Sequence, residues 1–380
     1  MMRVTKAKTA QGMVHVINGL GKISGAERAM LRVVFTQKQR PLTVVSLREV
    51  NRNHPALADW PDDIDLQEFH GPIGLIGATI RLAAFLARRP ATTLLCWMYR
   101  SNIAGTLATL FSRRHRLIWN VRHSLTRLEA EPVRVRLSIW LNRALSGRPQ
   151  KILYNSDCAR AQHEDYGFPA QKSLYVPNGF NPGPELPPRL TGGPSAEDAG
   201  TFVIGHAGRM TWEKDIGTLI TAFAQARKMT AHKLRLVMVG PGYEKENARF
   251  QEILVRHGVD DGSVEGRGRT DDMLGFFHDI DLFALSSVSE GFPNVLAEVQ
   301  MAARPCVTTD VGDASAIVAP EFGWVVPPED PKRFAEAIVQ AAMMDPKQLS
   351  ERGRAAREQT VTRFSLGPVA ARYDAAGGSE

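Results

Sequence analysis

The feature that most constrains the fold is a repeated alternation of short apolar runs with helical stretches. In the first half, runs rich in valine, leucine and isoleucine read as buried strands, separated by Gly-rich turns and amphipathic segments. The predicted strands of this half are residues 14–17, 42–46, 92–96, 116–121, 151–154 and 174–176. Strands that alternate with helices predict a parallel sheet covered by helices, the α/β class.

One stretch interrupts this rhythm, and the rhythm then restarts. Residues 181–200 are rich in proline and glycine and are predicted to be irregular. After them the predicted strands are residues 201–205, 234–239, a short one from Val264, 282–286 and 305–309. The predicted helices are residues 216–229, 242–256, 273–278, 294–303 and 331–344.

A chain of 380 residues is also long for a single core, and the pattern predicts two α/β domains. We expect an N-terminal domain at residues 1–182, a linker at 183–200 and a C-terminal domain at 201–362. A last helix at 363–380 either stays with the second domain or crosses back to the first. Pairs of such domains usually bind ligand beyond the carboxyl ends of their strands.

Composition narrows the class of protein. The sequence is 43% hydrophobic and 23% charged, as in globular proteins. No apolar run approaches the ~20 residues that span a bilayer, and the N-terminus lacks the order of a signal peptide. The three cysteines are scattered and predict reduced thiols rather than disulfides or zinc ligands. We therefore expect a cytoplasmic protein, with peripheral attachment to the inner membrane left open.

Positive charge gathers in the first half. The chain carries a net charge of +7, and between positions 81 and 151 only Glu129 and Glu131 oppose a long series of arginines. Such a field attracts polyanions, but no stacking-aromatic or recognition-helix pattern favours nucleic acid. Residues 133–145 combine arginines with Trp140 and aliphatic side chains, which fits either an anionic membrane surface or an ordinary core-packed helix.

The strongest chemical signal is the segment from Ser289 to Glu298, directly after a predicted strand. Pro293 suits the first position of a helix, so nearby free amides form an anion site. Glu290 and Glu298 place two carboxylates around that helix end, with Glu298 about 7 Å further along the helix axis. One could accept hydrogen bonds from sugar hydroxyls and the other from ribose hydroxyls. The alternative is a capped helix with a solvated glutamate.

A second signal follows another predicted strand. Arg209 and Lys214 lie five residues apart on a strand-to-helix loop. An arginine offers bidentate contacts and a lysine a point charge, so together they could neutralise one diphosphate without a metal. No His, Cys or Asp cluster has ligand spacing, and we expect no metal site. The alternative is two solvated surface cations.

These motifs together resemble glycosyltransferase family four, a retaining GT-B family. The resemblance rests on Gly208-Arg209 with Glu213-Lys214, on Gly266, on the Glu290 and Glu298 pair, and on the segments 305–312 and 323–328. It implies a GT-B fold, with two Rossmann-like domains facing across a cleft. It also implies that Arg209 and Lys214 hold the donor diphosphate, and that Glu298 holds the ribose. The implied sugar site is Glu290 with the backbone of Gly291, Phe292, Asn294 and Val295, and the implied base-selecting loop contains Gly266 and Arg267.

The first half resembles the family less closely. Ser24 to Arg28 looks like its Gly-Gly-Ala-Glu turn, so Gly25 and Ala26 would let backbone approach the donor, unless this is an ordinary turn. Asn178 lies in a Pro-Asn-Gly stretch that resembles a donor-site segment but also fits a hinge turn. Many members have a histidine after the fourth strand of this half. Here Arg122 stands at that position and His123 follows, and either could face the sugar.

We therefore predict a metal-independent glycosyltransferase, resembling the bacterial surface-polysaccharide and lipopolysaccharide enzymes. It would move a sugar from a UDP- or GDP-sugar to a saccharide or lipid-linked saccharide, with retention. The donor is a substrate, and no cofactor is expected. The alternatives are a non-catalytic binder of sugar nucleotides or polyanions, or a sugar-nucleotide epimerase on the same fold. The base, sugar, acceptor, linkage and oligomeric state stay open.

Overall fold

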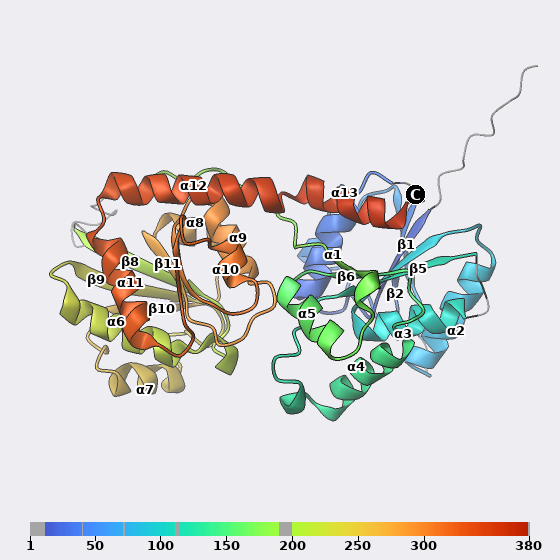
Figure 1. Ribbon diagram of the computed structural model, residues 1–380, viewed down its shortest axis with the longest axis horizontal. Helices are drawn as coiled ribbons and strands as arrows, with labels where there is room; N and C mark the ends of the chain where they lie inside the picture. Colours follow the sequence, from blue (N-terminus) through green and yellow to red (C-terminus); the bar gives the residue numbers. More distant parts are fainter. Residues whose placement is uncertain are drawn as a thin grey trace, which may run out of the picture. The chain divides into compact units, whose positions relative to one another are not determined.

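The computed structural model describes residues 12–39, 41–70, 73–110, 112, 114–189 and 200–378. Its chain divides into two compact units (Figure 1). The first unit comprises Met1–Gly179 and Leu366–Glu380, and the second comprises Phe180–Ser365. Each unit is built on one parallel sheet, which confirms the predicted pair of Rossmann-like folds.

The first sheet has seven strands in the order β3-β2-β1-β4-β5-β6-β7. Its strands are β1 (Met13–Ile17), β2 (Leu42–Ser46), β3 (Ile64–Glu68), β4 (Thr93–Trp97), β5 (Arg116–Val121), β6 (Lys151–Tyr154) and β7 (Ser173–Tyr175). Its helices are α1 (Gly25–Thr36), α2 (Leu75–Ala87), α3 (Met98–Thr109), α4 (Val133–Leu145), α5 (Asp157–Asp165) and α13 (Leu366–Gly377). The strand order reverses between β1 and β4, which makes this a switch point.

Alternation along β1 explains how this sheet is covered on both faces. Val14 and Val16 join a core with side chains of α2, α3 and α4. Met13 and Ile17 point the other way, into a core with side chains of α1 and α13. Successive strand side chains face opposite sides, so a strand that is apolar throughout must be covered twice.

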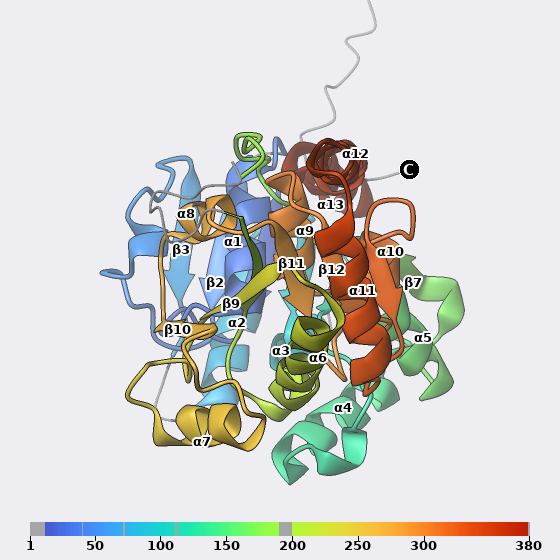
Figure 2. The same cartoon turned by 90° about the vertical axis from the view of Figure 1, so that its left-hand side faces the viewer.

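The second sheet has six strands in the order β10-β9-β8-β11-β12-β13. Its strands are β8 (Thr201–Ala207), β9 (Lys233–Val239), β10 (Val264–Gly268), β11 (Leu282–Leu285), β12 (Cys306–Thr309) and β13 (Trp324–Val326). Its helices are α6 (Ile216–Met229), α7 (Ala248–Arg256), α8 (Met273–His278), α9 (Asn294–Met301), α10 (Ala314–Ile317), α11 (Pro331–Met343) and α12 (Pro346–Phe364). Here the switch point lies between β8 and β11. Figure 2 shows α6, α7 and α11 on one side of this sheet, and their buried side chains share one core.

The C-terminal chain differs from the predicted single helix at 363–380. It forms two helices, and α12 ends at Phe364 in the second unit while α13 belongs to the first. On α13, the hydroxyl of Tyr373 accepts a hydrogen bond from Asn120 at 2.9 Å, and its ring stacks on Trp97. The Asp374 carboxylate accepts a hydrogen bond from Gln37 at 2.8 Å. Side chains of three elements thus fix α13 to the first unit.

The predicted linker is ordered where the structure describes it. Residues 190–199 lie outside the described residues, but 181–189 belong to the second unit. Arg189 forms an ion pair with Asp281 at 2.9 Å, and Arg304 donates to the backbone oxygen of Pro187 at 2.8 Å.

In the described part of the chain, no helix is both long enough and apolar enough to cross a bilayer.

Candidate functional site

The candidate site lies at the carboxyl edge of the second sheet. All its strands run parallel, so the loops that follow β8, β11 and β12 emerge at the same edge. The β8 loop carries Arg209 and Lys214, and the β11 loop carries Glu290. Because β8 and β11 are adjacent at the switch point, the loops that carry these residues are neighbours.

The structure joins two of the predicted residues directly. The Lys214 Nζ lies 2.6 Å from Oε1 of Glu290, and the two side chains are only 19% and 15% exposed. The hydroxyl of Ser287 donates to the same carboxylate oxygen at 2.8 Å. A ligand that reaches the ammonium group therefore also reaches the carboxylate. Sequence reasoning missed Ser287, because nothing in its spacing distinguishes it from an ordinary loop serine.

Backbone contacts hold the two loops together. The amide of Val288 donates to the carbonyl of Glu213 at 2.8 Å. The Ser286 hydroxyl contacts the carbonyls of Lys214 and Asp215 at 2.9 and 3.0 Å. Asp215 adopts the left-handed conformation, with φ of 40°, and caps helix α6 by accepting from the amide of Thr218. These contacts hold the backbone at Lys214, whose side chain pairs with Glu290.

Two glycines permit the close packing of these loops. A Cβ on Gly240 would lie 1.8 Å from the carbonyl oxygen of Gly208. A Cβ on Gly312, where φ is +57°, would lie 2.4 Å from the carbonyl oxygen of Glu290. The amide of Asp313 then donates to the carbonyl of Gly291 at 2.9 Å. The segment that carries Glu290 is therefore fixed by the β12 loop as well as by the β8 loop.

Helix α9 begins at the predicted residue, but Pro293 is not its first helical residue. Pro293 is the residue before the first turn rather than within it, and the helix starts at Asn294. The Phe292 side chain is 7% exposed and packs on the rings of Phe180 and Phe364, so its backbone is the part available to a ligand. Val295 and Glu298 are partly buried on the same helix. The first turn still offers backbone amides at the edge that carries Glu290.

Arg209 differs from Lys214 in its surroundings. It is exposed, and its guanidinium makes no hydrogen bond or ion pair with any described residue. A guanidinium on the same loop as Lys214 can therefore bind an anion without first breaking a contact.

A buried histidine lies at the end of β8, just before the loop that carries Arg209 and Lys214, and the sequence analysis did not identify it as important. In His206, Nδ1 lies 3.0 Å from the carbonyl oxygen of Ala284, and Nε2 lies 3.2 Å from the hydroxyl of Tyr243. Burial lowers the pKa of His206 to about 4; the bond to Ala284 opposes this shift and the charge of Lys214 adds to it. The imidazole is therefore neutral at pH 7, and it links strands β8 and β11 to the loop after β9.

The predicted base-selecting residues have other contacts. A Cβ on Gly266 would lie 2.2 Å from the carbonyl oxygen of Tyr243, so packing requires glycine there. The guanidinium of Arg267 is paired with Glu265 at 2.8 Å and with Asp279 at 2.9 Å. No contact between described residues joins Arg267 to the Lys214 and Glu290 pair.

In the first unit, the predicted turn is the start of α1. Ser24 is the N-cap, and its backbone amide donates to the Glu27 carboxylate at 3.0 Å, which is a capping box. Gly25 and Ala26 are the first residues of the helix. A Cβ on Gly25 would meet nothing within 4 Å, so packing with the described residues does not explain the glycine.

Arg122 and His123 point to different partners. The guanidinium of Arg122 lies 3.3 Å from the hydroxyl of Tyr373, donates to Asn178, and sits 5.4 Å from the ring centroid of Trp97. Burial lowers the pKa of Arg122, and its contact with Tyr373 opposes that shift. His123 instead lies 3.1 Å from Glu131 and is 30% exposed. Of the two, His123 is the more accessible to a ligand, while Arg122 and Asn178 belong to one internal network.

Among the described residues, no group of three or more His, Cys, Asp or Glu side chains is arranged to hold a metal ion.

Two family models match the chain. The "Glycosyl transferase 4-like domain" matches residues 12–179, and "Glycosyl transferases group 1" matches residues 201–343. The chain is a family-four glycosyltransferase. The two matches follow the two units, and the family agrees with the motifs around Arg209 and Glu290.

Solved structures show the fold of this family-four glycosyltransferase to be GT-B. HepE of Anabaena, solved in complex with UDP and glucose, superposes with a TM-score of 0.77 at 17% identity, covering 96% of this chain and 98% of HepE. The apo form of the lipopolysaccharide outer core galactosyltransferase WaaB gives a TM-score of 0.73 at 15% identity, covering 96% and 99%.

Curated relatives match over a shorter stretch. The capsular polysaccharide biosynthesis glycosyltransferase CapM of Staphylococcus aureus is 29% identical over 149 residues, which is 36% of this chain and 36% of CapM. Glycogen synthase of Mycobacterium tuberculosis is 27% identical over 172 residues, 43% of this chain and 39% of the enzyme. The chain thus matches less than half the length of either relative. These two relatives make different polymers, so family membership alone does not assign the acceptor.

Proposed function

We propose that this chain transfers a sugar from a UDP- or GDP-sugar to a hydroxyl of a saccharide or lipid-linked saccharide, with retention, in the synthesis of a surface polysaccharide. The observation that carries the proposal is the pair of Lys214 and Glu290, 2.6 Å apart at the switch point of the second sheet. Arg209, on the same loop as Lys214, has a guanidinium with no partner among the described residues. One anion-binding group and one hydroxyl-binding group at the same edge suit a ligand that has both a diphosphate and a sugar.

The proposed chemistry is electrostatic. The bond between the anomeric carbon and the diphosphate oxygen breaks, and its electron pair goes to that oxygen, where Arg209 and Lys214 stabilise the new charge. The acceptor oxygen bonds to the anomeric carbon on the same face, and its proton passes to the departing diphosphate. Preorganised charge of this kind is commonly the largest catalytic contribution. Glu290 accepts hydrogen bonds from sugar hydroxyls, Glu298 binds the ribose, and no side chain acts as a nucleophile.

The comparisons support this proposal at a coarser level. HepE has the same fold and is described with UDP and glucose, which favours a nucleotide-sugar donor here. The names of CapM and WaaB favour a capsule or lipopolysaccharide product. A lipid-linked acceptor would also place the enzyme at a membrane surface, as a peripheral protein.

The test begins with thermal shifts for UDP, GDP, ADP and their sugars. A ligand at 100 times its Kd stabilises the native state by about 2.7 kcal/mol, so the correct base should stand out. Release of nucleoside diphosphate is then measured with and without candidate acceptors. Acceptor-dependent release supports a transferase. Binding without release points to a non-catalytic binder, and conversion of the sugar nucleotide without acceptor points to an epimerase; either result overturns the proposal.

A further inference from the structure

Exposed apolar side chains gather on one helical layer of the first unit. Helices α2, α3 and α4 cover the same face of its sheet, and α3 contacts both neighbours (Figure 1). More than half of the large apolar side chains that are exposed in the described residues belong to this layer or to the turn before it. They are Ile73, Ile76, Ile80, Leu107, Val133, Leu137 and Trp140.

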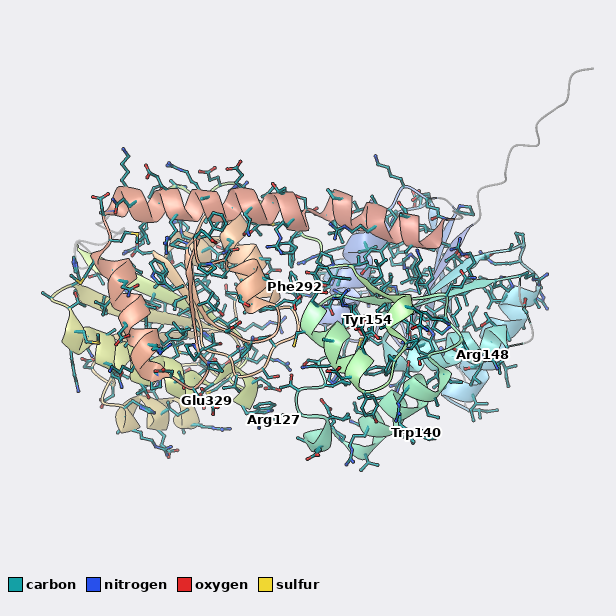
Figure 3. All side chains as sticks on the ribbon, in the orientation of Figure 1. Arg127, Trp140, Arg148, Tyr154, Phe292 and Glu329 are labelled. Atoms are coloured by element: carbon teal, nitrogen blue, oxygen red, sulfur yellow. The ribbon has the colours of Figure 1, made fainter. Side chains whose placement is uncertain are left out.

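On α4 these side chains form a single stripe. Val133, Leu137 and Trp140 are spaced four and three residues apart, so they share one face of the helix. They are 77%, 54% and 52% exposed, whereas Ile139 and Asn142 are buried on the opposite face. Figure 3 shows Trp140 on the outer side of α4. The sequence left open whether this helix packs its apolar residues inward, and the structure shows that this stripe does not.

Helix α2 carries a second stripe that the sequence analysis did not identify. Ile76 and Ile80 are four residues apart on one face of α2, Ile73 lies just before the helix, and all three are more than 60% exposed. The inward face of α2 is a separate set, Ala78, Leu82 and Leu86, which is buried in the core. A helix that packs on a core needs only one apolar face, so the fold of this unit does not explain the exposed isoleucines.

The same layer is strongly basic. None of the three helices contains an aspartate or glutamate, whereas α4 alone carries Arg134, Arg136 and Arg143, all of them exposed. Arg136 and Arg143 lie on the same side of α4 as Leu137 and Trp140, by helical spacing. Nearby, Glu131 is already close to His123. The face therefore presents aliphatic and aromatic groups among uncompensated positive charges.

We propose that this face, formed by the outer sides of α2, α3 and α4, docks on a bilayer surface that contains anionic lipid. The apolar stripes would enter the boundary between headgroups and acyl chains, while the arginines would contact lipid phosphates. Each basic residue near such a surface contributes about 1 kcal/mol. This inference deepens the proposed function and rests on it only for the lipid-linked acceptor, which such docking would bring to the enzyme.

Charge argues against other occupants. A symmetric dimer through this face would bring the arginines of two copies together, which is unfavourable. Single-stranded nucleic acid is held largely by stacking on aromatic side chains, and the stripes are aliphatic except for Trp140. An anionic bilayer satisfies both the apolar groups and the charge.

The experiment is co-sedimentation with vesicles of phosphatidylcholine alone and of phosphatidylcholine with phosphatidylglycerol, at low and high salt. We expect binding only to the anionic vesicles, weakened by salt. The double variants Ile76→Ser with Ile80→Ser, Leu137→Ser with Trp140→Ser, and Arg136→Glu with Arg143→Glu should each lower the partition coefficient about tenfold or more. The control, Val255→Ser with Met343→Ser, removes two equally exposed apolar side chains of the second unit and should bind like the parent.

Further measurements distinguish the outcomes. Emission from Trp140, taken as the difference between the parent and Trp140→Phe, should shift to shorter wavelength when anionic vesicles are added. Thermal shifts with the donor nucleotide should be the same in all variants, which also shows that they fold. Equal binding to both kinds of vesicle, binding to neither, a dimer that the variants dissociate, or displacement of the vesicles by RNA overturns the docking proposal. Loss of donor binding with vesicle binding intact would overturn the proposed function alone.

Discussion

Replacing Lys214 with alanine should affect both the rate of sugar transfer and the stability of the second unit, and the two effects can be measured separately. The Lys214 ammonium lies 2.6 Å from the Glu290 carboxylate, in a pair that is mostly shielded from solvent. In the proposed reaction it also stabilises the departing diphosphate. Loss of one such preorganised contact costs ~3 kcal/mol in the transition state, so kcat/KM should fall about 10²-fold or more.

The same substitution should destabilise the second unit. Without Lys214, the partly buried Glu290 carboxylate keeps the Ser287 hydroxyl as its remaining hydrogen-bond partner among the described residues. Leaving a buried polar group short of partners costs about 1–3 kcal/mol, or roughly 3–10 °C in Tm for a domain of this size. Adding Glu290→Gln removes the uncompensated charge, so the double variant should regain much of the stability and none of the activity.

The assay is initial-rate release of nucleoside diphosphate, together with thermal unfolding of each variant. Lys228→Ala serves as the matched control, since Lys228 is an exposed lysine at the far end of α6. Arg209→Ala should lower kcat/KM as much as Lys214→Ala but leave Tm nearly unchanged, because its guanidinium has no partner among the described residues. Parent-like turnover in either variant would refute the role of these cations.

Three further outcomes are expected. Glu298→Gln should chiefly weaken nucleotide binding and Glu290→Gln should chiefly lower kcat; titration calorimetry that finds unchanged nucleotide affinity for Glu298→Gln contradicts the ribose role. Activity should persist in excess EDTA because Arg209 and Lys214 neutralise the diphosphate, and complete loss that magnesium or manganese restores would show this to be wrong. Burial lowers the pKa of His206 from 6.5 to about 4, so between these values the unfolded chain binds a proton that the folded chain excludes. Its contribution to stability is therefore unchanged above pH 6.5 and falls by about 1.4 kcal/mol per pH unit below it. In urea unfolding, the free energy of unfolding of His206→Gln should depend less steeply on pH than that of the parent. An equal dependence counts against the buried neutral imidazole.

Sequence patterns located the regular elements where their signals were strong. The predicted helices 133–145, 216–229 and 273–278 have the bounds of α4, α6 and α8. Strand β3 was missed because only Ile64 of its five residues is buried, so its composition is that of a solvated edge. The helix predicted from 242 begins at Ala248, because Gly242 has a φ of +103° and the residues after it form turns.

The arrangement of the candidate site, though not its function, could be predicted in part. Periodicity and motif spacing could place Lys214 and Glu290 on neighbouring loops, because parallel strands end at one edge. They could not show that the two side chains pair, since that depends on the left-handed turn at Asp215 and on the loop contacts of Ser286. The contact between His206 and Tyr243 could not be predicted either, because the two residues are 37 positions apart and nothing in the sequence pairs them.

The return of α13 to the first unit bears on how the protein matures during synthesis. Tyr373 lies 253 positions after Asn120, its hydrogen-bonding partner, and the whole second unit is encoded between them. The nascent first segment therefore leaves the ribosome with the surface around Trp97 uncovered, and that surface stays uncovered until α13 has been translated. The second unit is contiguous and can close as soon as it emerges. We expect the unit that is made first to be the last to reach its final form, with its dependence on chaperones greatest in that interval.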